Sequence, residues 1–325
     1  MKINDTVYGE IEINESVLIE LINSKPLQRI KKVNQAGTQL VEPHRTSTRY
    51  DHCVGVLILL RKYDASIEEQ IGGLLHDVPH TAFSHAVDFV FKEGESQVYH
   101  ERFLQKIVFE SEIPAILKKY NIDPEFVTND EHFSLLEQPI PNLCADRIDY
   151  ILRDMVGDKT YSPKNVDQIL TNLVVVNKIF AIKNQLVALK FARDFMNQAS
   201  NSYNAPKTLA TFELMRELIR DCFSKGILVE NDLFTTDETV MEKIKKSDDQ
   251  NIQRLLKLLN PKLDVKFNEE DYDYETRGKV RYIDPLVKVG ETTKPLTSLI
   301  PTFSNEINEF IAKTKKGYRV KLSQT

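Results

Sequence analysis

Histidine is concentrated in one short part of the chain. Six of the seven histidines lie between residues 44 and 100: His44, His52, His76, His80, His85 and His100. Imidazole is a common ligand of transition metals, and carboxylates often complete such sites. The sequence therefore favours a metal site in this region. For His44, and for the isolated His132, an ordinary hydrogen-bonded role is the alternative interpretation.

Four candidate ligands occupy positions from which helices can direct them to one centre. His52 opens an apolar helical stretch. The pair His76 and Asp77 closes the next one, and Asp146 lies inside a third, ADRIDYILRD. Antiparallel helices of a bundle can aim such residues at one interior point. Because Pro79 ends the second helix, adjacent His and Asp can both reach one ion, and the two oxygens of Asp77 can also bridge two ions.

Helices must position these residues. From about residue 16 to residue 225, apolar residues recur three and four apart, as in DHCVGVLILLRKY, IEEQIGGLLHDV and NLCADRIDYILRDMV. This spacing predicts a helical bundle. Alternation around Gly9 predicts a short hairpin at the start of the chain, and LVVVNKIFAIKNQLVALKF, broken at Asn184 and Gln185, predicts a second hairpin between helices.

The composition changes beyond residue 230. VMEKIKKSDDQNIQRLLKLL keeps helical spacing, whereas LDVKFNEEDYDYETRGKVRYIDPLVKV alternates and is followed by a last helix near NEINEFIAK. We therefore expect a main domain over residues 1–230 and a smaller α+β lobe of unknown role over residues 231–325. The charged runs 269–271 and 313–316 are interpreted as solvated faces.

The bulk composition excludes several classes of protein. Lys and Arg number 43 against 48 Asp and Glu, a net charge of −5, so no global basic field favours extended nucleic acid or anionic lipid. The chain has no apolar run of about eighteen residues and no secretory leader, which predicts a cytoplasmic protein without a membrane span. Cys53, Cys144 and Cys222 lack zinc-knuckle spacing and are predicted to be buried thiols.

The order of the motifs is specific. TRYDHCVGV, GLLHDVPHTAFSH, YHE and ADRIDYILRD follow one another as in the HD superfamily of metal-dependent phosphohydrolases, and the chain most resembles its deoxynucleoside triphosphate triphosphohydrolase branch. The likeness runs from about Gln28 to Asp154 and continues more weakly to about residue 225. It implies a mainly α fold, an HD-domain helical bundle with small β-hairpin insertions.

The resemblance implies roles for individual residues. The metal ligands would be His52, His76, Asp77 and Asp146, and the divalent ion stays undecided among Fe, Mn, Mg, Zn, Ni and Co. The phosphate side of the cleft would be lined by His80, His85 and His100, with Asp88 and Glu101 as orienting carboxylates. Contacts to substrate phosphate and sugar are implied for Arg49, Gln35, Arg147, Tyr150 and Asp154.

Some positions allow another interpretation or depart from the family pattern. Asp149, Arg153 and Asp154 have the spacing of ion pairs within a helix, which is the structural alternative for them. Pro79 stands where relatives usually carry glycine and bears on the direction of His80. After Arg193 the likeness is loose, so Tyr203 is only a candidate for a sugar-stacking tyrosine. Lys207 is a further candidate there.

The resulting hypothesis is hydrolysis of a nucleotide phosphoester. In the resembling branch, attack at the α-phosphorus releases nucleoside and tripolyphosphate, and His85 or His100 could protonate the leaving oxygen. The alternatives are an HD nucleotidase or signalling-nucleotide phosphohydrolase, or a catalytically silent nucleotide-binding module. The expected partner is a nucleotide, with no extended nucleic acid and no membrane. The sequence leaves a homo-oligomer open.

Overall fold

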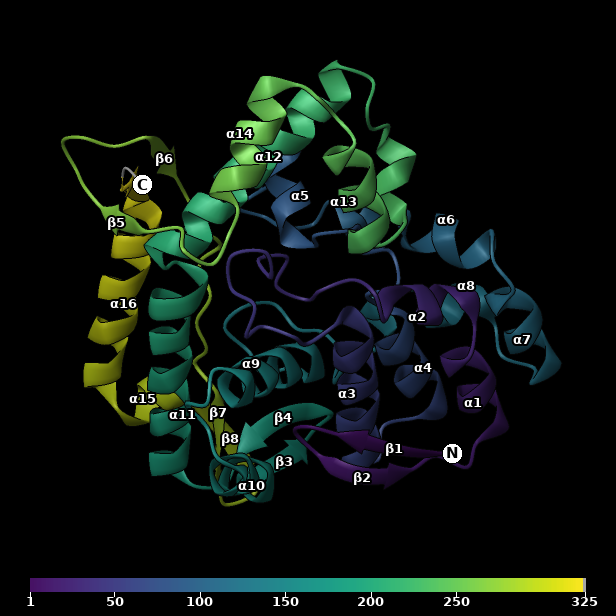
Figure 1. Ribbon diagram of the computed structural model, residues 1–325. Coiled ribbons are helices and arrows are strands. Elements are labelled where there is room, and N and C mark those ends of the chain that lie inside the picture. Colours follow the sequence, from purple (N-terminus) through teal and green to yellow (C-terminus); the bar gives the residue numbers. More distant parts are fainter. Residues whose placement is uncertain (324–325) are drawn as a thin grey trace.

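Helices dominate the fold, as the sequence predicted (Figure 1). The computed structural model describes residues 1–323, and 16 α-helices together with four short 3₁₀- or π-helical segments account for just over half of them. The helices are α1 (Ser16–Ile22), α2 (Lys25–Ile30), α3 (Arg49–Lys62), α4 (Ile67–Leu75), α5 (His85–Val90), α6 (Leu104–Phe109), α7 (Ile113–Lys119), α8 (Pro124–Val127), α9 (Ala145–Gly157), α10 (Pro163–Asn172), α11 (Gln185–Gln198), α12 (Pro206–Ser224), α13 (Asp237–Lys245), α14 (Gln250–Leu258), α15 (Leu296–Leu299) and α16 (Pro301–Lys316). Across residues 1–323, no helix combines the length and apolar character needed to cross a bilayer.

The strands are short and form three small sheets. β1 pairs with β2, the strands β3, β4, β7 and β8 form a second sheet in that order, and β9 lies between β5 and β6 in a third. The strands are β1 (Lys2–Asp5), β2 (Gly9–Glu12), β3 (Leu173–Val176), β4 (Ile179–Ile182), β5 (Val265–Phe267), β6 (Tyr274–Thr276), β7 (Leu286–Val289), β8 (Thr292–Pro295) and β9 (Tyr318–Leu322).

Helix α3 is a buried central helix that carries the first site residues. It begins after Thr48, whose hydroxyl accepts a hydrogen bond from the Asp51 amide at 3.2 Å, while the Asp51 carboxylate accepts from the Thr48 amide at 2.8 Å. This reciprocal cap fixes where the helix starts. Helix α9 packs closely across α3 because Gly55 has no side chain: a Cβ there would lie 2.0 Å from an Asp149 oxygen.

The N-terminal hairpin is confirmed, while the second predicted hairpin ends earlier than expected. The β3–β4 turn lies at Asn177 and Lys178, both of which have positive φ. Asn184 does not form a turn. Its side chain caps α11 by accepting a hydrogen bond from the Leu186 amide at 2.9 Å, so the stretch after it is helical rather than extended.

Residues 231–323 pack onto the helical part rather than around a separate core. β7 pairs in parallel with β4, so the β3–β4 hairpin forms one half of a four-stranded sheet whose other half, β7 and β8, comes from the C-terminal part of the chain (Figure 1). Val287 and Phe303 share one hydrophobic cluster with Val56 of α3 and Ile148 of α9. Helices α13 and α14 share another cluster with α12 and α5. A change of composition near residue 230 therefore does not coincide with a break in packing.

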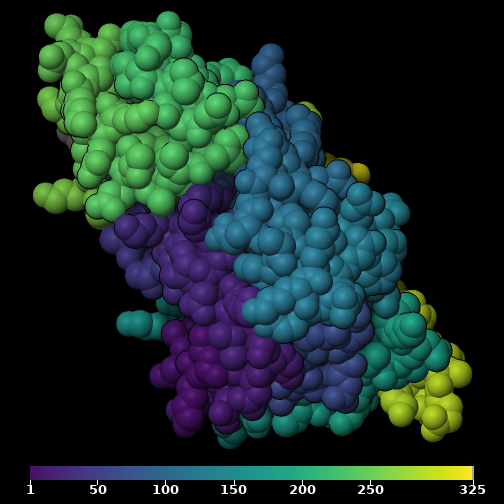
Figure 2. Space-filling view, turned by 90° about the vertical axis from the view of Figure 1, so that its right-hand side faces the viewer, coloured from purple at the N-terminus to yellow at the C-terminus, as the bar shows by residue number. Residues whose placement is uncertain are grey.

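The outer face formed by α6–α8 is seen in Figure 2. There the segment coloured blue lies beside the purple N-terminal part and to the right of the green residues of α13 and α14. Ile113 and Leu117 of α7 pack into one cluster with Leu18 and Leu21 of α1. The helices after the histidine-rich region thus extend the N-terminal core.

A buried ion-pair network ties the N-terminal hairpin to α9. The Arg153 guanidinium lies 3.0 Å from an Asp5 oxygen and 2.9 Å from an Asp149 oxygen. All three side chains are buried, with no more than 4% of any of them exposed. Removing one partner from a buried pair leaves an uncompensated charge. We therefore expect Asp5→Ala to lower the free energy of unfolding by about 3 to 5 kcal/mol in chemical denaturation.

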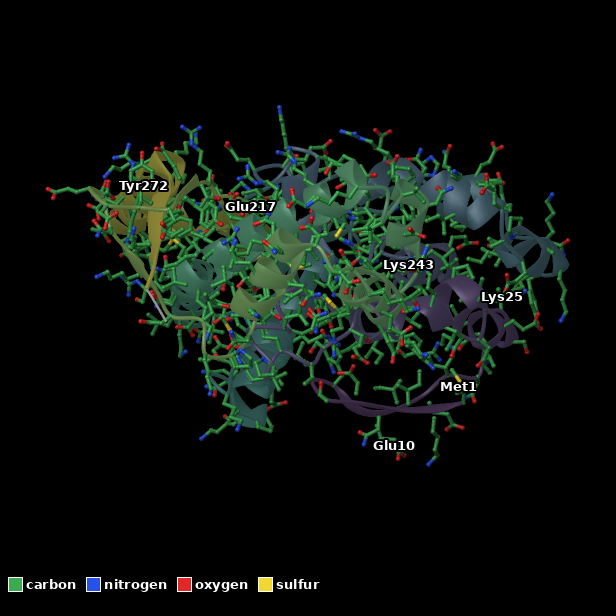
Figure 3. All side chains as sticks on the ribbon, turned by 45° about the horizontal axis from the view of Figure 1, so that its top comes forward. Met1, Glu10, Lys25, Glu217, Lys243 and Tyr272 are labelled. Atoms are coloured by element: carbon green, nitrogen blue, oxygen red, sulfur yellow. The ribbon has the colours of Figure 1, made fainter. Side chains whose placement is uncertain are left out.

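The matched control is Glu10→Ala. Glu10 pairs with Lys2 at 3.0 Å, but both side chains are more than two-thirds exposed, and Figure 3 shows Glu10 on the outside of the hairpin. An exposed pair contributes about 0 to 1 kcal/mol. Equal stability of the two variants would show that Asp5 does not hold the hairpin.

Candidate metal centre

The four predicted ligands converge from three parts of the chain. His52 lies in the first turn of α3, His76 and Asp77 follow the end of α4, and Asp146 lies in the first turn of α9. The Asp146 carboxylate lies 3.0 Å from Nε2 of His52 and 3.5 Å from Nε2 of His76. Asp77 lies 3.6 Å from both rings. The helical arrangement thus brings together residues as far apart as 52 and 146.

The proton positions on the two rings show why this cluster fits a metal ion. Nδ1 of His76 lies 2.7 Å from the Gly73 carbonyl, which can only accept, so this nitrogen carries the proton. Nδ1 of His52 lies 2.7 Å from an Asp149 oxygen and is assigned a proton for the same reason. In the neutral rings both Nε2 atoms then present lone pairs, yet they are only 3.2 Å apart. Lone pairs and carboxylates at such distances repel one another unless a cation is bound between them.

The electrostatics of the cluster point the same way. Burial lowers the pKa of His52, but hydrogen bonds to Asp146 and Asp149 outweigh it and raise that pKa to about 10. For the carboxylate of Asp146 burial has the opposite effect and would raise the pKa, but hydrogen bonds and charge from His52 and His76 outweigh it and bring this pKa well below its usual value. The site therefore stabilises positive charge strongly, and a divalent ion satisfies the same demand as a proton.

Asp149 is a functional residue that sequence reasoning assigned to an ordinary helical ion pair. The pair with Arg153 exists, but the same carboxylate also binds Nδ1 of His52. It therefore sets the tautomer and direction of a candidate metal ligand. The spacing of Asp149 three residues after Asp146 was the available signal, because both then lie near one face of the helix.

Arg49 is engaged by the metal centre itself. Its guanidinium lies 2.6 Å from an Asp77 oxygen, donates to the Ser84 hydroxyl at 3.0 Å, and donates to the Gln35 carbonyl at 2.9 Å. This predicted phosphate-binding residue therefore first orients Asp77 and compensates its charge. Its side chain also lines the cavity described below.

Three further histidines lie on the other side of Asp77. His80 and His100 stack with ring centroids 3.5 Å apart, and their Nε2 atoms lie 3.4 and 3.6 Å from one Asp77 oxygen. His80 faces Asp77 although Pro79 precedes it. Burial, followed by the charge of Arg49, lowers the pKa of His80 to about 4, so this ring is neutral near pH 7.

His85 forms a pair with Asp88. Nδ1 of His85 lies 2.9 Å from one Asp88 oxygen, and the Tyr99 amide donates to the other at 3.2 Å. Burial raises the pKa of Asp88 to about 7 in spite of that amide and Arg49. The predicted orienting role of Asp88 agrees with this contact. Glu101 lines the cavity, but within residues 1–323 its carboxylate accepts no hydrogen bond from a histidine.

A cavity of about 620 Å³ opens over the cluster. This volume lies in the range of small-molecule sites, about 300 to 1,000 Å³. Its wall includes all four candidate ligands, the three phosphate-side histidines, and the predicted substrate residues Gln35, Arg49, Arg147, Tyr150 and Asp154.

The predicted substrate residues differ in whether their polar groups already form hydrogen bonds or ion pairs within the protein. Arg147 donates to the Asn142 carbonyl at 2.6 Å and lies 3.3 Å from Glu137, so it holds a loop as well as facing the cavity. Asp154 accepts a hydrogen bond from the Tyr203 hydroxyl at 2.7 Å, which brings the candidate tyrosine into the site. Lys207 is exposed and donates to the Pro261 carbonyl instead, so it does not contribute to the cavity.

The histidines interpreted as ordinary residues lie outside the cluster. His44 is mostly exposed and lies 3.3 Å from Asp158. His132 is exposed and stacks on Phe126 with centroids 4.3 Å apart. The three cysteines are buried free thiols, as predicted.

Comparisons with known proteins agree with this geometry. The family model of the HD domain matches residues 49–154. The uncharacterized protein YdhJ of Bacillus subtilis is 34% identical over 324 residues, which cover 99% of both chains. The chain belongs to the HD superfamily of metal-dependent phosphohydrolases.

Other HD proteins show the same likeness over different lengths. Cns2 of Cordyceps militaris, named a metal-dependent phosphohydrolase, is 27% identical over 321 residues, 95% of this chain and 92% of its own. A SAMHD1 homolog of Dictyostelium discoideum, named a deoxynucleoside triphosphate triphosphohydrolase, is 31% identical over 115 residues, 30% of this chain and 22% of its own. A solved phosphohydrolase from Bacteroides thetaiotaomicron has a TM-score of 0.69 at 16% identity, with both chains covered completely, which shows a shared fold.

Residues outside the matched HD segment support the site. Phe83 and Ser84 both have positive φ, which is strained for such side chains. Asp237 of α13 holds this turn, because its carboxylate accepts hydrogen bonds from the amides of Phe83 and Asn34, each at 2.8 Å. No local signal in the sequence marked Asp237.

Two more cavity residues come from the segment between β6 and β7. Lys279 and Arg281 line the cavity, although sequence reasoning assigned no role to this part of the chain. The signal that could have found them is the alternation of Lys279 and Arg281 with Val280 and Tyr282, which places basic and apolar residues on opposite sides of an extended segment.

Asp146→Asn is expected to lower the bound metal to well below one ion per chain while the fold is retained. The amide keeps the size of the carboxylate but removes its charge, and empty carboxylate clusters are repulsive, so folding does not suffer. Metal content is measured by elemental analysis after dialysis. Asp130→Asn is the control, since Asp130 lines the cavity but lies outside the cluster. Full metal occupancy in Asp146→Asn would contradict the assignment.

Proposed function

We propose that this HD protein hydrolyses a deoxynucleoside triphosphate to nucleoside and tripolyphosphate. The observation that carries the proposal is that one cavity contains both the His/Asp cluster and a wall of cationic and aromatic side chains extending beyond it. A cluster alone would serve any small phosphoester. The additional wall suits a substrate with a long anionic part and a sugar. The activity in the name of the Dictyostelium relative supports the same substrate class.

The residues at the centre have defined tasks in this reaction. A divalent ion held by His52, His76, Asp77 and Asp146 would supply a Lewis acid and a water of lowered pKa. Arg49 holds Asp77 in place and compensates its charge, and its side chain lines the cavity beside the reacting phosphate. His80 and His100 are buried neutral rings that can donate hydrogen bonds to phosphoryl oxygens without adding charge.

The leaving group needs a proton, and the His85–Asp88 pair is placed to supply one. When the α-phosphorus–oxygen bond breaks, the 5′ oxygen of the nucleoside receives a proton from Nε2 of His85. The ring recovers a proton at Nδ1 from Asp88, which lies 2.9 Å away. Because burial raises the pKa of Asp88 to about 7, that carboxyl still holds its proton near neutral pH.

The sugar end of the substrate would meet a different set of residues. The rings of Tyr150 and Tyr203 pack edge to face with centroids 6.3 Å apart, and the Tyr203 hydroxyl donates to Asp154. Gln35 is buried in the same wall, and its side-chain oxygen has no hydrogen-bond partner within residues 1–323. A sugar hydroxyl can provide that partner.

Product analysis tests the proposal directly. The metal-containing protein is incubated separately with each deoxynucleoside triphosphate, ribonucleoside triphosphate and deoxynucleoside monophosphate, and the products are resolved by ion-exchange chromatography. We expect nucleoside and tripolyphosphate from deoxynucleoside triphosphates, and loss of this activity when a chelator removes the metal. Inert triphosphates beside cleaved monophosphates would identify a nucleotidase. Ligand-induced thermal stabilisation without any turnover would identify a binding module.

The pH dependence tests the role of Asp88. The donor is active when Asp88 is protonated, so the rate of turnover should fall as the pH rises through about 7. In Asp88→Asn the amide cannot release a proton, and turnover at neutral pH should fall about 10²- to 10⁴-fold. The fall in rate near pH 7 should then be absent. An unchanged pH profile in Asp88→Asn would assign the proton to another group.

A further inference from the structure

We infer that Lys279 and Arg281 form the binding site for the phosphate chain of the substrate. Both residues lie far beyond the matched HD segment, on the connection between β6 and β7. The inference rests on the proposed function for the identity of the substrate. The chemical class of ligand, a linear polyphosphate, follows from the charges of the cavity alone.

The connection between β6 and β7 is fixed at both ends by strand pairing, and its middle forms part of the cavity wall. β6 pairs with β9, and β7 pairs with β4 and β8, so residues 277–285 span two sheets. Gly278 lets the backbone approach closely, because a Cβ there would lie 2.0 Å from the side-chain oxygen of Asn204. Val280 and Tyr282 pack against the main hydrophobic cluster, while Lys279 and Arg281 line the cavity. The alternation of an extended segment therefore directs both basic residues inward.

The other cations of the cavity wall already have carboxylate partners. Arg49 lies 2.6 Å from Asp77, and Arg45 lies 3.3 Å from Glu42. The two remaining arginines also form ion pairs, Arg147 with Glu137 at 3.3 Å and Arg102 with Glu93. These arginines therefore bring little net charge to an incoming anion.

Lys279 and Arg281 differ from these arginines. Within residues 1–323, Lys279 forms no ion pair and no side-chain hydrogen bond, although burial lowers the pKa of its ammonium group. Arg281 donates to the neutral side chain of Gln97 and lies 5.2 Å from the Tyr203 ring centroid. Within residues 1–323, the cations of the cavity wall that have no carboxylate at ion-pair distance thus lie on one segment.

A half-buried ammonium group without an ion-pair partner is unfavourable, and a bound polyanion supplies that partner. Phosphate oxygens accept hydrogen bonds from Lys and Arg, and charge-assisted bonds of this kind are about twice as strong as neutral ones. The His/Asp cluster would face the reacting phosphorus, and the connection would hold the phosphates beyond it. A monophosphate has no phosphates to reach this segment, so the segment selects for a triphosphate.

Calorimetry with inorganic tripolyphosphate tests the site without requiring turnover. The purified full chain with its metal is compared with Lys279→Gln, Lys279→Arg, Lys279→Gln/Arg281→Gln and the control Arg277→Gln. Arg277 has the same charge on the same connection but is exposed and lies outside the cavity wall. We expect Lys279→Gln to weaken binding at least about tenfold, since it removes a charged hydrogen bond. The double variant should weaken binding further, and Lys279→Arg and Arg277→Gln should bind as the wild type does.

Two further measurements exclude indirect effects. Lys279→Gln should unfold at a temperature no lower than that of the wild type, because it removes a half-buried charge that has no ion-pair partner within residues 1–323, and its metal content should be unchanged. In steady-state kinetics, KM for a deoxynucleoside triphosphate should rise by about the same factor as the binding constant. Hydrolysis of bis(p-nitrophenyl) phosphate, which lacks a phosphate chain, should keep its KM.

The outcomes separate this inference from the proposed function. Equal tripolyphosphate binding by Lys279→Gln and Arg277→Gln, or no binding by the wild type, would overturn the inference even if triphosphates are hydrolysed. Conversely, binding that depends on Lys279 in a protein that releases no nucleoside from any triphosphate would support the polyphosphate site and overturn the proposed function.

Discussion

The interaction on which this structure depends is the meeting of two imidazole lone pairs and two carboxylates at one point. Nε2 of His52 and Nε2 of His76 face each other at 3.2 Å because the Nδ1–H group of each ring donates a hydrogen bond to a fixed acceptor. Such an arrangement is unfavourable unless positive charge is bound, so it has to be imposed by the fold. Helices α3, α4 and α9 impose it by presenting their ends and first turns to a common centre.

Holding this centre requires buried polar groups that a stable core would otherwise avoid. Asp149 orients His52, Arg153 compensates Asp149, and Asp5 of the N-terminal hairpin compensates Arg153. Gly55 leaves the space in α3 that this chain of charges occupies. On the opposite side, Asp237 holds the strained turn before His85. Elements at both ends of the chain therefore contribute to the rigidity of a site whose ligands all lie between residues 52 and 146.

Two parts of the chain supply different kinds of side chain to the cavity wall. The helical part provides ligands, neutral histidines and arginines that are already paired with carboxylates. Within residues 1–323, Lys279 and Arg281 of the connection between β6 and β7 line the same cavity without a carboxylate at ion-pair distance. In the proposed reaction, the chemistry at phosphorus and the binding of the rest of the substrate would therefore be carried by different segments.

The sequence by itself determined the helical architecture and the candidate ligands, because both depend on short-range spacing. Helical periodicity, the break at Pro79 and the ordered motifs are all local properties. Tertiary structure alone decided that Asp149 sets the tautomer of His52, that Arg147 is bound to a loop, and that the turn after β3 lies before Asn184. It also decided that Lys279 and Arg281 reach a cavity whose candidate metal ligands lie more than a hundred residues earlier in the sequence. These features depend on which surfaces meet after the chain folds, and sheet pairing between β4 and β7 has no local signature.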